Sequence, residues 1–485
     1  MDELSSWAVN RRNLIRGVGA TAVGMLAPRV LRAAESAEVI VLGAGLAGLY
    51  SAMLLEEFGF RVTLLEASDH VGGRVQTRDF GGTLHELGAS DIGVMYARVL
   101  DMMRRLELER IPSSIRVRPF TYHVRGQLVR ADDWAEAAAN QTTGEERNIA
   151  PARMSSELLN RYNPLQELDD WLSPDFQNLD VPIADYLRQQ GVSAEAIRLM
   201  GHTYNGIGMD RTSALSLFRD TTRTNFGIRA FRAMKEAGQT VAPLSEVAGG
   251  NQRLPDAMAA SLKTEIRFGQ AAAAIAQDAS GIEVTSIDGT RYRGAFLVAA
   301  IPFPALRQIE ITPTLSPLKA AATSQVPYYS ATKFYLRPTS RFWEADGLEP
   351  SLWSDGQLER VFAMSDGSDD VHTLVVWING QGSQRIDQYD HESATRLVLD
   401  LLAEVRPASR GQIEVMGHYS WGTTPFIGGC GLSYSAGQIS RFAAELPRPE
   451  GRIHFAGEHT RRSEFGMESA MASAERVATE ILEAG

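Results

Sequence analysis

A glycine-rich turn near the start of the chain has the residue types and spacing to bind a phosphate-bearing cofactor. Gly43, Gly45 and Gly48 follow a short apolar run with the pattern G-x-G-x-x-G, and a helix-like stretch begins beside them. Such glycines permit a tight turn and bring backbone N–H groups and a helix N-terminus against a pyrophosphate. Glu66 ends the next apolar run, where a carboxylate can accept hydrogen bonds from a ribose. The pattern predicts dinucleotide binding but does not separate FAD from NAD.

A β–α–β unit is needed to position these residues, and the chain has the pattern of one. We predict strands over 39–42 and 62–65, with a helix over 49–58 between them. Segments typical of nucleotide-binding domains recur in the middle and at the end of the chain, and stretches of different composition separate them. This order indicates a discontinuous domain. The further predicted helices cover 132–140, 155–172, 254–262 and 466–482, and the further predicted strands cover 282–284, 296–298, 331–336, 372–378 and 453–457.

The composition is acidic, and the first residues carry a different signal. The 485 residues have a formal net charge of −11, which argues against nucleic acid as a partner because phosphates attract Lys and Arg. Arg11 and Arg12, a weakly apolar run and the small residues Ala33 and Ala34 are typical of a twin-arginine export signal over 1–34. The alternative is a basic arm without a targeting role. We expect a periplasmic or secreted protein.

Several later motifs resemble those of one family. The stretch 66–77 continues from Glu66 through the turn Gly72–Arg74, and 451–460 reads as a strand entering a loop. In order, and over nearly the whole mature chain, the motifs resemble the flavin-containing amine oxidases, a family that includes monoamine, L-amino-acid, polyamine and bacterial nicotine-degrading oxidases. The resemblance implies FAD as the cofactor. The other matching stretches are 249–252, 300–302, 466–470 and 474–476.

The resemblance also implies a fold and a set of cofactor contacts. The implied fold is α/β, in which a Rossmann-like FAD-binding domain packs against a mixed α+β substrate-binding domain. We assign 37–106, 240–306 and 425–485 to the discontinuous FAD-binding domain, and 107–239 and 307–424 to the substrate-binding domain. The cofactor-binding residues carried over from the family are Gly43, Gly45, Ala47, Gly48, Glu66, Ala67, Gly73, Arg74, Ala272, Trp421, Cys430, Gly457, Glu458, Gly466 and Met467.

Two residues carry chemistry beyond cofactor binding in this family. Lys333 lies in a segment resembling the one whose lysine holds a water against flavin N5, so the resemblance implies a catalytic role in oxygen activation. The alternative is an ordinary exposed strand lysine. Cys430 is the only cysteine and lies where monoamine oxidases attach FAD through a thioether. The resemblance therefore implies covalent FAD, and the alternative is a small, inert thiol.

The substrate pocket departs from the family pattern. Monoamine oxidases place two aromatic rings at the positions that align with Gly431 and Gly466, so we expect a wider pocket that admits bulkier amines, partly closed by Phe465 or Trp421. Asp91 stands where L-amino-acid oxidases carry an arginine for the substrate carboxylate. An acid there would repel a carboxylate and attract a second ammonium. The alternative is a solvated loop aspartate.

We therefore expect FAD-dependent oxidation of a primary or secondary amine to an imine, with electrons passed to O2 to give H2O2. The alternatives within enzymes are an L-amino-acid oxidase, an amine dehydrogenase that uses a periplasmic electron carrier, and a carotenoid-type desaturase. A flavin-binding protein without turnover is the alternative outside enzymes. The expected partners are a small amine and O2 or the carrier, with a homodimer possible and no metal.

Overall fold

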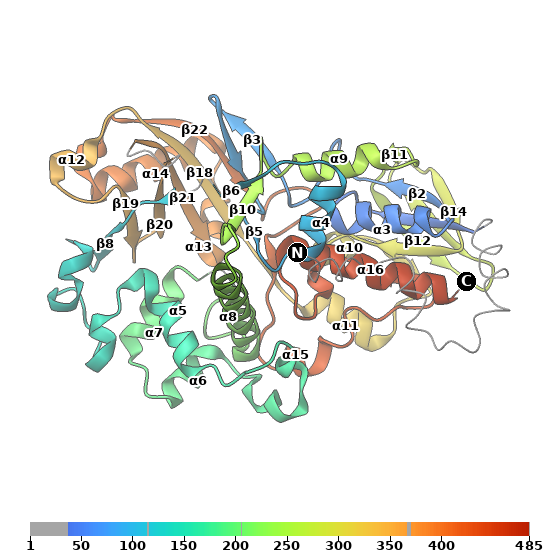
Figure 1. Cartoon of the computed structure of the whole chain (residues 1–485), viewed down its shortest axis with the longest axis horizontal. Helices are drawn as coiled ribbons and strands as arrows, with labels where there is room; N and C mark the ends of the chain where they lie inside the picture. The colour runs from blue at the N-terminus through green and yellow to red at the C-terminus, as the bar shows by residue number, and fades with distance from the viewer. Residues whose placement is uncertain (1–36, 114–115, 205, 366–369, 485) are drawn as a thin grey trace.

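The computed structural model describes residues 37–113, 116–204, 206–365 and 370–484. The export signal predicted over 1–34 lies outside the described residues. The described chain forms two main bodies, one around a parallel sheet and one around a larger mixed sheet (Figure 1).

The parallel sheet has the strand order β11-β2-β1-β15-β24, and every pairing between neighbouring strands is parallel. Its strands come from three separate stretches of the chain, as the sequence pattern predicts. Because the inner strands are covered on both faces, they are almost wholly apolar and buried. The strands are β1 (Glu38–Leu42), β2 (Arg61–Leu65), β11 (Ile266–Arg267), β15 (Phe296–Ala299) and β24 (Ile453–Phe455).

Two helices pack against each other and against this sheet. α3 (Leu46–Glu57) follows β1 directly, and α16 (Gly466–Ala484) ends the described chain beside it. Most residues of α3 are buried, so this helix lies inside the domain rather than on its surface. The predicted β–α–β unit and the α/β fold class are confirmed.

The second body is built on an eight-stranded sheet with the path β22-β18-β21-β20-β19-β8-β9, and β7 pairs with β20 off this path. The β19–β8 pairing is parallel and the others are antiparallel, so the sheet is mixed. Buried residues of α14 (His391–Val405) pack against it. The strands are β7 (Arg116–Val117), β8 (Phe120–Val124), β9 (Gln127–Val129), β18 (Ala331–Pro338), β19 (Ser351–Ser354), β20 (Arg360–Ser365), β21 (Val371–Asn379) and β22 (Ile413–Ser420).

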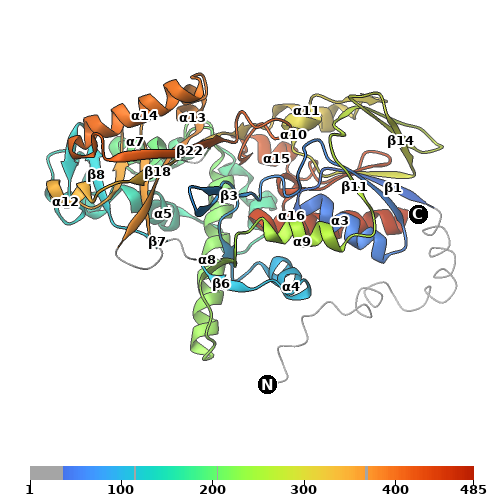
Figure 2. The same ribbon diagram turned by 90° about the horizontal axis from the view of Figure 1, so that it is seen from above.

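A helical layer belongs to the second body, and the sequence predicted it only in part. The helix predicted over 155–172 is wrong in its second half, because α5 (Pro151–Tyr162) ends before Pro164, whose ring disfavours helical backbone in the preceding residue. The helix predicted over 132–140 is a short 3₁₀ segment, Ala131–Glu136. α8 (Ala214–Glu236) lies in the stretch from about 107 to 239 that we predict to be helical, although no bounds were predicted for it, and it runs out from the body (Figure 2). The layer also contains α6 (Ile183–Gln189) and α7 (Ala194–His202).

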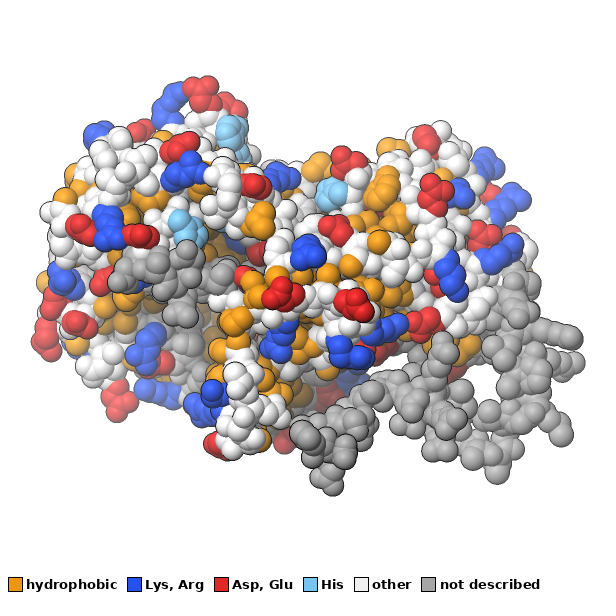
Figure 3. Space-filling model, turned by 45° about the horizontal axis from the view of Figure 1, so that its top comes forward, with side chains coloured by type: hydrophobic (Ala, Val, Ile, Leu, Met, Phe, Trp, Pro, Cys, Tyr) orange, Lys and Arg blue, Asp and Glu red, His pale blue; other side chains and the backbone are white. Residues whose placement is uncertain are grey.

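A four-stranded sheet, β14-β13-β12-β16, and several shorter elements complete the fold. Of the described helices, none has the length and apolar character needed to cross a membrane. On the face in Figure 3, acidic and basic side chains are interspersed. The remaining elements are β3 (Thr77–Phe80), β4 (Thr83–Glu86), β5 (Ile92–Gly93), α4 (Ala97–Arg105), β6 (Arg110–Pro112), β10 (Leu244–Val247), α9 (Arg253–Ser261), β12 (Ala272–Gln277), β13 (Ile282–Ser286), β14 (Arg291–Gly294), α10 (Phe303–Leu306), β16 (Glu310–Thr312), α11 (Pro317–Gln325), β17 (Tyr328–Tyr329), α12 (Phe342–Asp346), α13 (Gly380–Ile386), β23 (Gly431–Leu432) and α15 (Gln438–Phe442).

Candidate active site

The glycine turn forms a cradle at the N-terminus of α3. Gly43 has φ +95°, and a Cβ on Gly48 would lie 1.8 Å from the Gly43 carbonyl oxygen, so the helix can approach the turn only with glycine there. A Cβ on Gly45 would meet nothing nearer than 3.9 Å, which leaves space above the helix end. No side chain caps α3 and no acidic residue lies in its first turn. These free N–H groups suit a pyrophosphate.

The predicted cofactor residues around this cradle lie close together. Glu66 Oε2 accepts a hydrogen bond from the Ala44 N–H at 2.6 Å, and Glu66 Oε1 accepts one from the Ser68 N–H at 2.8 Å, which brings the carboxylate beside Ala67 and the turn. The Gln270 N–H donates to the Glu66 carbonyl oxygen at 2.8 Å. The start of β12, where Ala272 lies, is thereby held near the same strand end.

Arg74 joins the cradle to the C-terminal part of the chain. Its Nη1 donates to the Cys430 carbonyl oxygen at 3.0 Å and to Glu458 Oε2 at 3.3 Å. Gly73 precedes Arg74 in the turn, and a Cβ on it would lie 3.5 Å from the Gly45 Cα, so the two glycine turns are in contact. Gly457 follows β24 and donates its N–H to Ser473 Oγ on α16 at 2.7 Å. The structure thus brings together residues that lie more than 350 positions apart.

Lys333 lies on β18 with its ammonium group in a buried site. Only 6% of the residue is exposed, and Nζ donates to the carbonyl oxygens of Leu87 at 3.1 Å and Glu86 at 3.3 Å. Nζ also lies 4.2 Å from the centroid of the Trp377 ring on the next strand. Burial lowers the pKa of Lys333 to about 8, although the charges of Cys430, Glu86 and Asp91 act in the opposite direction. The exposed-lysine alternative is therefore wrong.

Trp421 and Cys430 lie beside this lysine. Trp421 is buried, and its Nε1 donates to the same Leu87 carbonyl oxygen at 3.0 Å. Cys430 is partly buried and packs against the small cluster that contains Leu87 and Trp421. Burial raises the pKa of the Cys430 thiol, whereas a hydrogen bond from Tyr329 and the charge of Lys333 lower it.

The two glycines at the expected aromatic positions do not open a wide pocket. A Cβ on Gly431 would lie 3.0 Å from the Tyr329 ring, and a Cβ on Gly466 would lie 2.9 Å from the Tyr96 hydroxyl oxygen. Both spaces are therefore filled by tyrosines from other elements. The expectation of a wider pocket, which rested on the missing side chains alone, is corrected by these contacts.

The other predicted pocket residues have different surroundings. Asp91 accepts hydrogen bonds from Ser90 Oγ and Ser113 Oγ, both at 3.1 Å, and its charge acts on Lys333. Phe465 is 45% exposed and its ring lies against Arg461, so it does not close a buried pocket. Met467, in the first turn of α16, is buried.

Sequence reasoning missed Glu86, Tyr96 and Tyr329. Burial raises the pKa of Glu86 to about 7, and its Oε1 accepts hydrogen bonds from Thr77 Oγ1 and the Asn251 N–H. Composition and spacing did not mark these residues, because each has its contact more than 100 positions away along the chain. An aromatic residue opposite a glycine on the neighbouring strand is a general pattern in sheets, and it could have indicated Tyr329.

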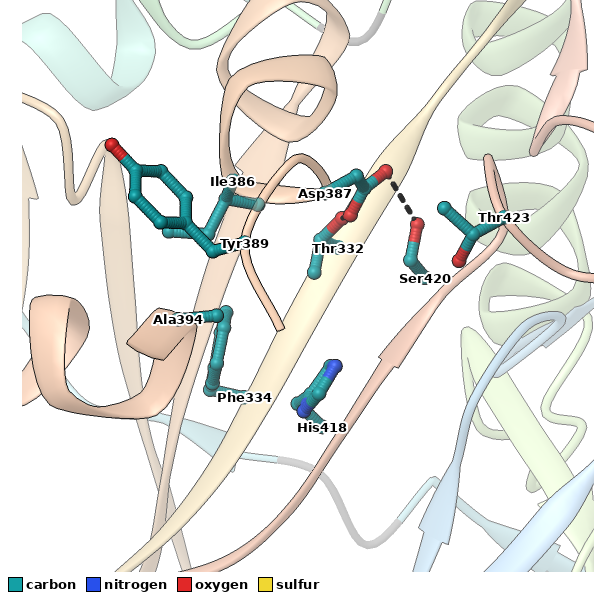
Figure 4. A pocket seen from close by; sticks show the side chains of 9 residues that line it. All are labelled: Thr332, Phe334, Ile386, Asp387, Tyr389, Ala394, His418, Ser420 and Thr423. Carbon is teal, nitrogen blue, oxygen red and sulfur yellow. Dashed lines mark hydrogen bonds between the residues drawn. The ribbon is translucent and has the colours of Figure 1, made fainter. Parts of the chain in front are cut away.

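A separate small pocket lies on the far side of β18 from Lys333. Its lining includes Thr332, Asp387 and His418, and the Asp387 carboxylate accepts hydrogen bonds from Ser420 Oγ and Thr332 Oγ1, both at 2.7 Å (Figure 4). These hydrogen bonds join β18, which carries Lys333, to β22, which ends directly before Trp421.

Comparisons with known proteins agree with this geometry. Residues 46–482 match the model of the flavin containing amine oxidoreductases. An L-amino-acid oxidase of Siganus canaliculatus is 28% identical over 92% of this chain and 85% of its own length. The flavin-dependent L-tryptophan oxidase RebO of Lentzea aerocolonigenes is 27% identical over 92% of this chain and 98% of its own length.

Two solved structures share the fold at lower identity. Putrescine oxidase bound to putrescine is 20% identical with a TM-score of 0.72, and cyclohexylamine oxidase from Brevibacterium oxydans IH-35A is 24% identical with a TM-score of 0.72. Each alignment covers 92% of this chain and 99% of the other. With the family match spanning most of the chain, this protein belongs to the flavin-containing amine oxidoreductases and is an oxidoreductase that acts on amines.

Proposed function

We propose that this protein oxidises a primary or secondary amine to an imine on FAD, and that O2 receives the electrons and forms H2O2. Water then hydrolyses the imine to a carbonyl compound and an amine or ammonia. The observation that carries the proposal is the buried ammonium of Lys333, held by two carbonyl oxygens between Trp377 and the Cys430 loop. A fixed cation in a dry site favours negative charge that develops on oxygen.

The chain's own residues bind and orient the reactants. When bound, FAD supplies the acceptor for a hydride equivalent from the carbon beside nitrogen. The N-terminus of α3 and Glu66 would hold its pyrophosphate and ribose, and Arg74 would add a positive charge near the Cys430 loop. The buried walls exclude water from the reacting centre, where Lys333 keeps a proton at Nζ.

The two candidate substrate classes are amines without a carboxylate and L-amino acids. Asp91 favours amines without a carboxylate, because its negative charge acts on the same site as Lys333. The second candidate is L-amino-acid oxidation, favoured by the names of the two sequence relatives. Asp91→Asn should lower kcat/KM for a diamine about tenfold, which is the scale of one charge pair. The kcat/KM for the matching monoamine should stay within about twofold of the native value. Equal loss for both amines would remove Asp91 from substrate selection.

Three further features belong to the proposal. FAD is attached covalently through Cys430, the protein is exported by the signal in 1–34, and it can form a homodimer. A periplasmic electron carrier in place of O2 is the alternative acceptor. The covalent link and the export rest on sequence motifs alone.

The experiment is an oxygen-electrode and peroxide assay with matched substrates. Monoamines, diamines and L-amino acids of equal chain length are supplied to the FAD-loaded protein in air. The proposal predicts stoichiometric O2 uptake and H2O2 release with at least one amine. Turnover of L-amino acids alone would favour the second candidate. Turnover only with an added cytochrome or dye would make the protein a dehydrogenase.

A further inference from the structure

Tyr329 covers Gly431 across a pair of short strands. β17 and β23 pair antiparallel with Tyr329 opposite Gly431, and the Cys430 N–H donates to the Tyr329 carbonyl oxygen at 2.8 Å. Directly opposed residues place their side chains on the same face. The bare Cα of Gly431 therefore lies under the Tyr329 ring, whose nearest atoms are 3.0 to 3.3 Å from a Cβ built there.

Tyr96 occupies the corresponding space beside Gly466. Tyr96 is the N-cap residue of α4 and offers no side-chain cap to that helix. Instead, the buried Glu468 accepts the Arg98 N–H at 3.0 Å and the Val99 N–H at 3.2 Å. This carboxylate, in the first turn of α16, ties the start of α4 to the start of α16. Tyr96 is thereby fixed against Gly466.

Both tyrosines lie within electrostatic reach of the same cation. The charge of Arg461 acts on both hydroxyls, Asp91 acts on Tyr96, and Glu458 acts on Tyr329. Burial raises the pKa of Tyr96 to about 12, and the nearby Cys430 with burial raises that of Tyr329 well above its usual value. Both rings stay neutral over the physiological pH range.

We propose that Tyr96 and Tyr329 are the two aromatic walls of the amine pocket, in the places that Gly466 and Gly431 leave bare. The inference rests on the proposed function and adds the residues that set substrate size. Aromatic faces attract an ammonium group and pack against its carbon chain. Because Tyr329 lies on β17 opposite Gly431 on β23, and Tyr96 lies at the start of α4 beside Gly466, each ring reaches the pocket from a neighbouring element.

This arrangement selects amines that fit between two rings. A narrow aromatic slot favours a primary or secondary amine on an unbranched or benzylic carbon over a bulky one. The Cys430 N–H donates to the Tyr329 carbonyl oxygen at 2.8 Å, so one wall is fixed to the residue beside the cofactor.

The first test measures binding without turnover. The probe is benzyltrimethylammonium, whose nitrogen has no lone pair to form a C=N bond when hydride leaves the neighbouring carbon, so it can bind without being oxidised. It is titrated into the FAD-loaded protein by calorimetry and by the change in flavin absorption. Tyr329→Ala and Tyr96→Ala should each weaken its binding about tenfold or more, whereas the Phe variants should stay within about threefold. Tyr389→Ala, at an exposed tyrosine, is the control. FAD content and melting temperature report folding.

The second test moves a wall back across the strand pair. Gly431→Tyr alone should lose probe binding, because two rings would compete for one space. Combining it with Tyr329→Gly should restore binding to within about threefold of the native protein, a non-additive result for contacting residues. If the Ala variants bind like the native protein, or the folded double variant binds as weakly as Tyr329→Gly, the inference is wrong. If the native protein oxidises no amine, the proposed function fails instead.

Discussion

Lys333→Met tests the role of the buried ammonium in oxygen reduction. The substitution keeps the length of the side chain and removes its charge. Burial lowers the pKa of Lys333 to about 8, so roughly nine-tenths of the molecules carry the proton at pH 7. Removing one preorganised charge contact slows the step that it serves by about 100-fold or more. We expect that loss in the reaction of the reduced protein with O2.

The structure indicates that the variant will fold. The Leu87 carbonyl oxygen keeps a hydrogen bond from Trp421 Nε1, and the Glu86 carbonyl oxygen keeps one from Tyr335 Oη at 3.2 Å. Neither carbonyl is left unpaired when the ammonium is lost. Methionine also fills irregular space well in an apolar site. The effect on O2 can therefore be separated from misfolding.

Stopped-flow mixing measures the two half-reactions separately. The amine-reduced protein is mixed with O2, and the oxidised protein is mixed with amine without air. The first rate should fall about 100-fold in Lys333→Met, and the second should change less than about tenfold. Lys235→Met, at an exposed lysine near the end of α8, is the matched control. A variant that reacts with O2 as fast as the native protein would refute the role of Lys333.

Three more predictions concern the Lys333 proton, the glycine turn and Cys430. The native O2 reaction should slow as pH rises through about 8, because the Lys333 proton is lost there, and a rate that rises with pH would contradict this. Gly45→Ala should weaken FAD binding without lowering the melting temperature of the FAD-free protein, whereas Gly48→Ala should lower both, since its Cβ would meet the turn at 1.8 Å. Calorimetry with and without FAD distinguishes the two glycines. After acid denaturation, FAD mass should stay on the peptide that contains Cys430 and be released in Cys430→Ser, and free FAD from the native protein would remove the covalent link.

The local elements around the cofactor were predictable because short-range rules determine them. An apolar strand, a glycine turn and a helix in direct succession leave few alternatives, and β1, α3 and β2 formed where the pattern placed them. The helix predicted over 155–172 extends too far, because polar, helix-like composition continues past Pro164. The observed helix ends before that proline. The bounds of α8 were not predicted because no single apolar stripe runs along it.

The pocket walls were not predictable from aligned positions alone. Gly431 and Gly466 indicated empty space, because a sequence shows that a side chain is missing at a position but not which other side chains lie next to it. The neighbours are Tyr329, 102 positions before Gly431, and Tyr96, 370 positions before Gly466. Only the β17–β23 register and the α4–α16 contact bring each pair together.

An anaerobic titration of the FAD-loaded protein with an amine tests the central claim most directly. The claim predicts that the flavin absorption bleaches with one equivalent of a primary or secondary amine, and that the corresponding carbonyl compound appears by mass spectrometry in equal amount. A flavin that stays oxidised with every monoamine, diamine and L-amino acid supplied, in a protein that holds one FAD per chain, would contradict the claim.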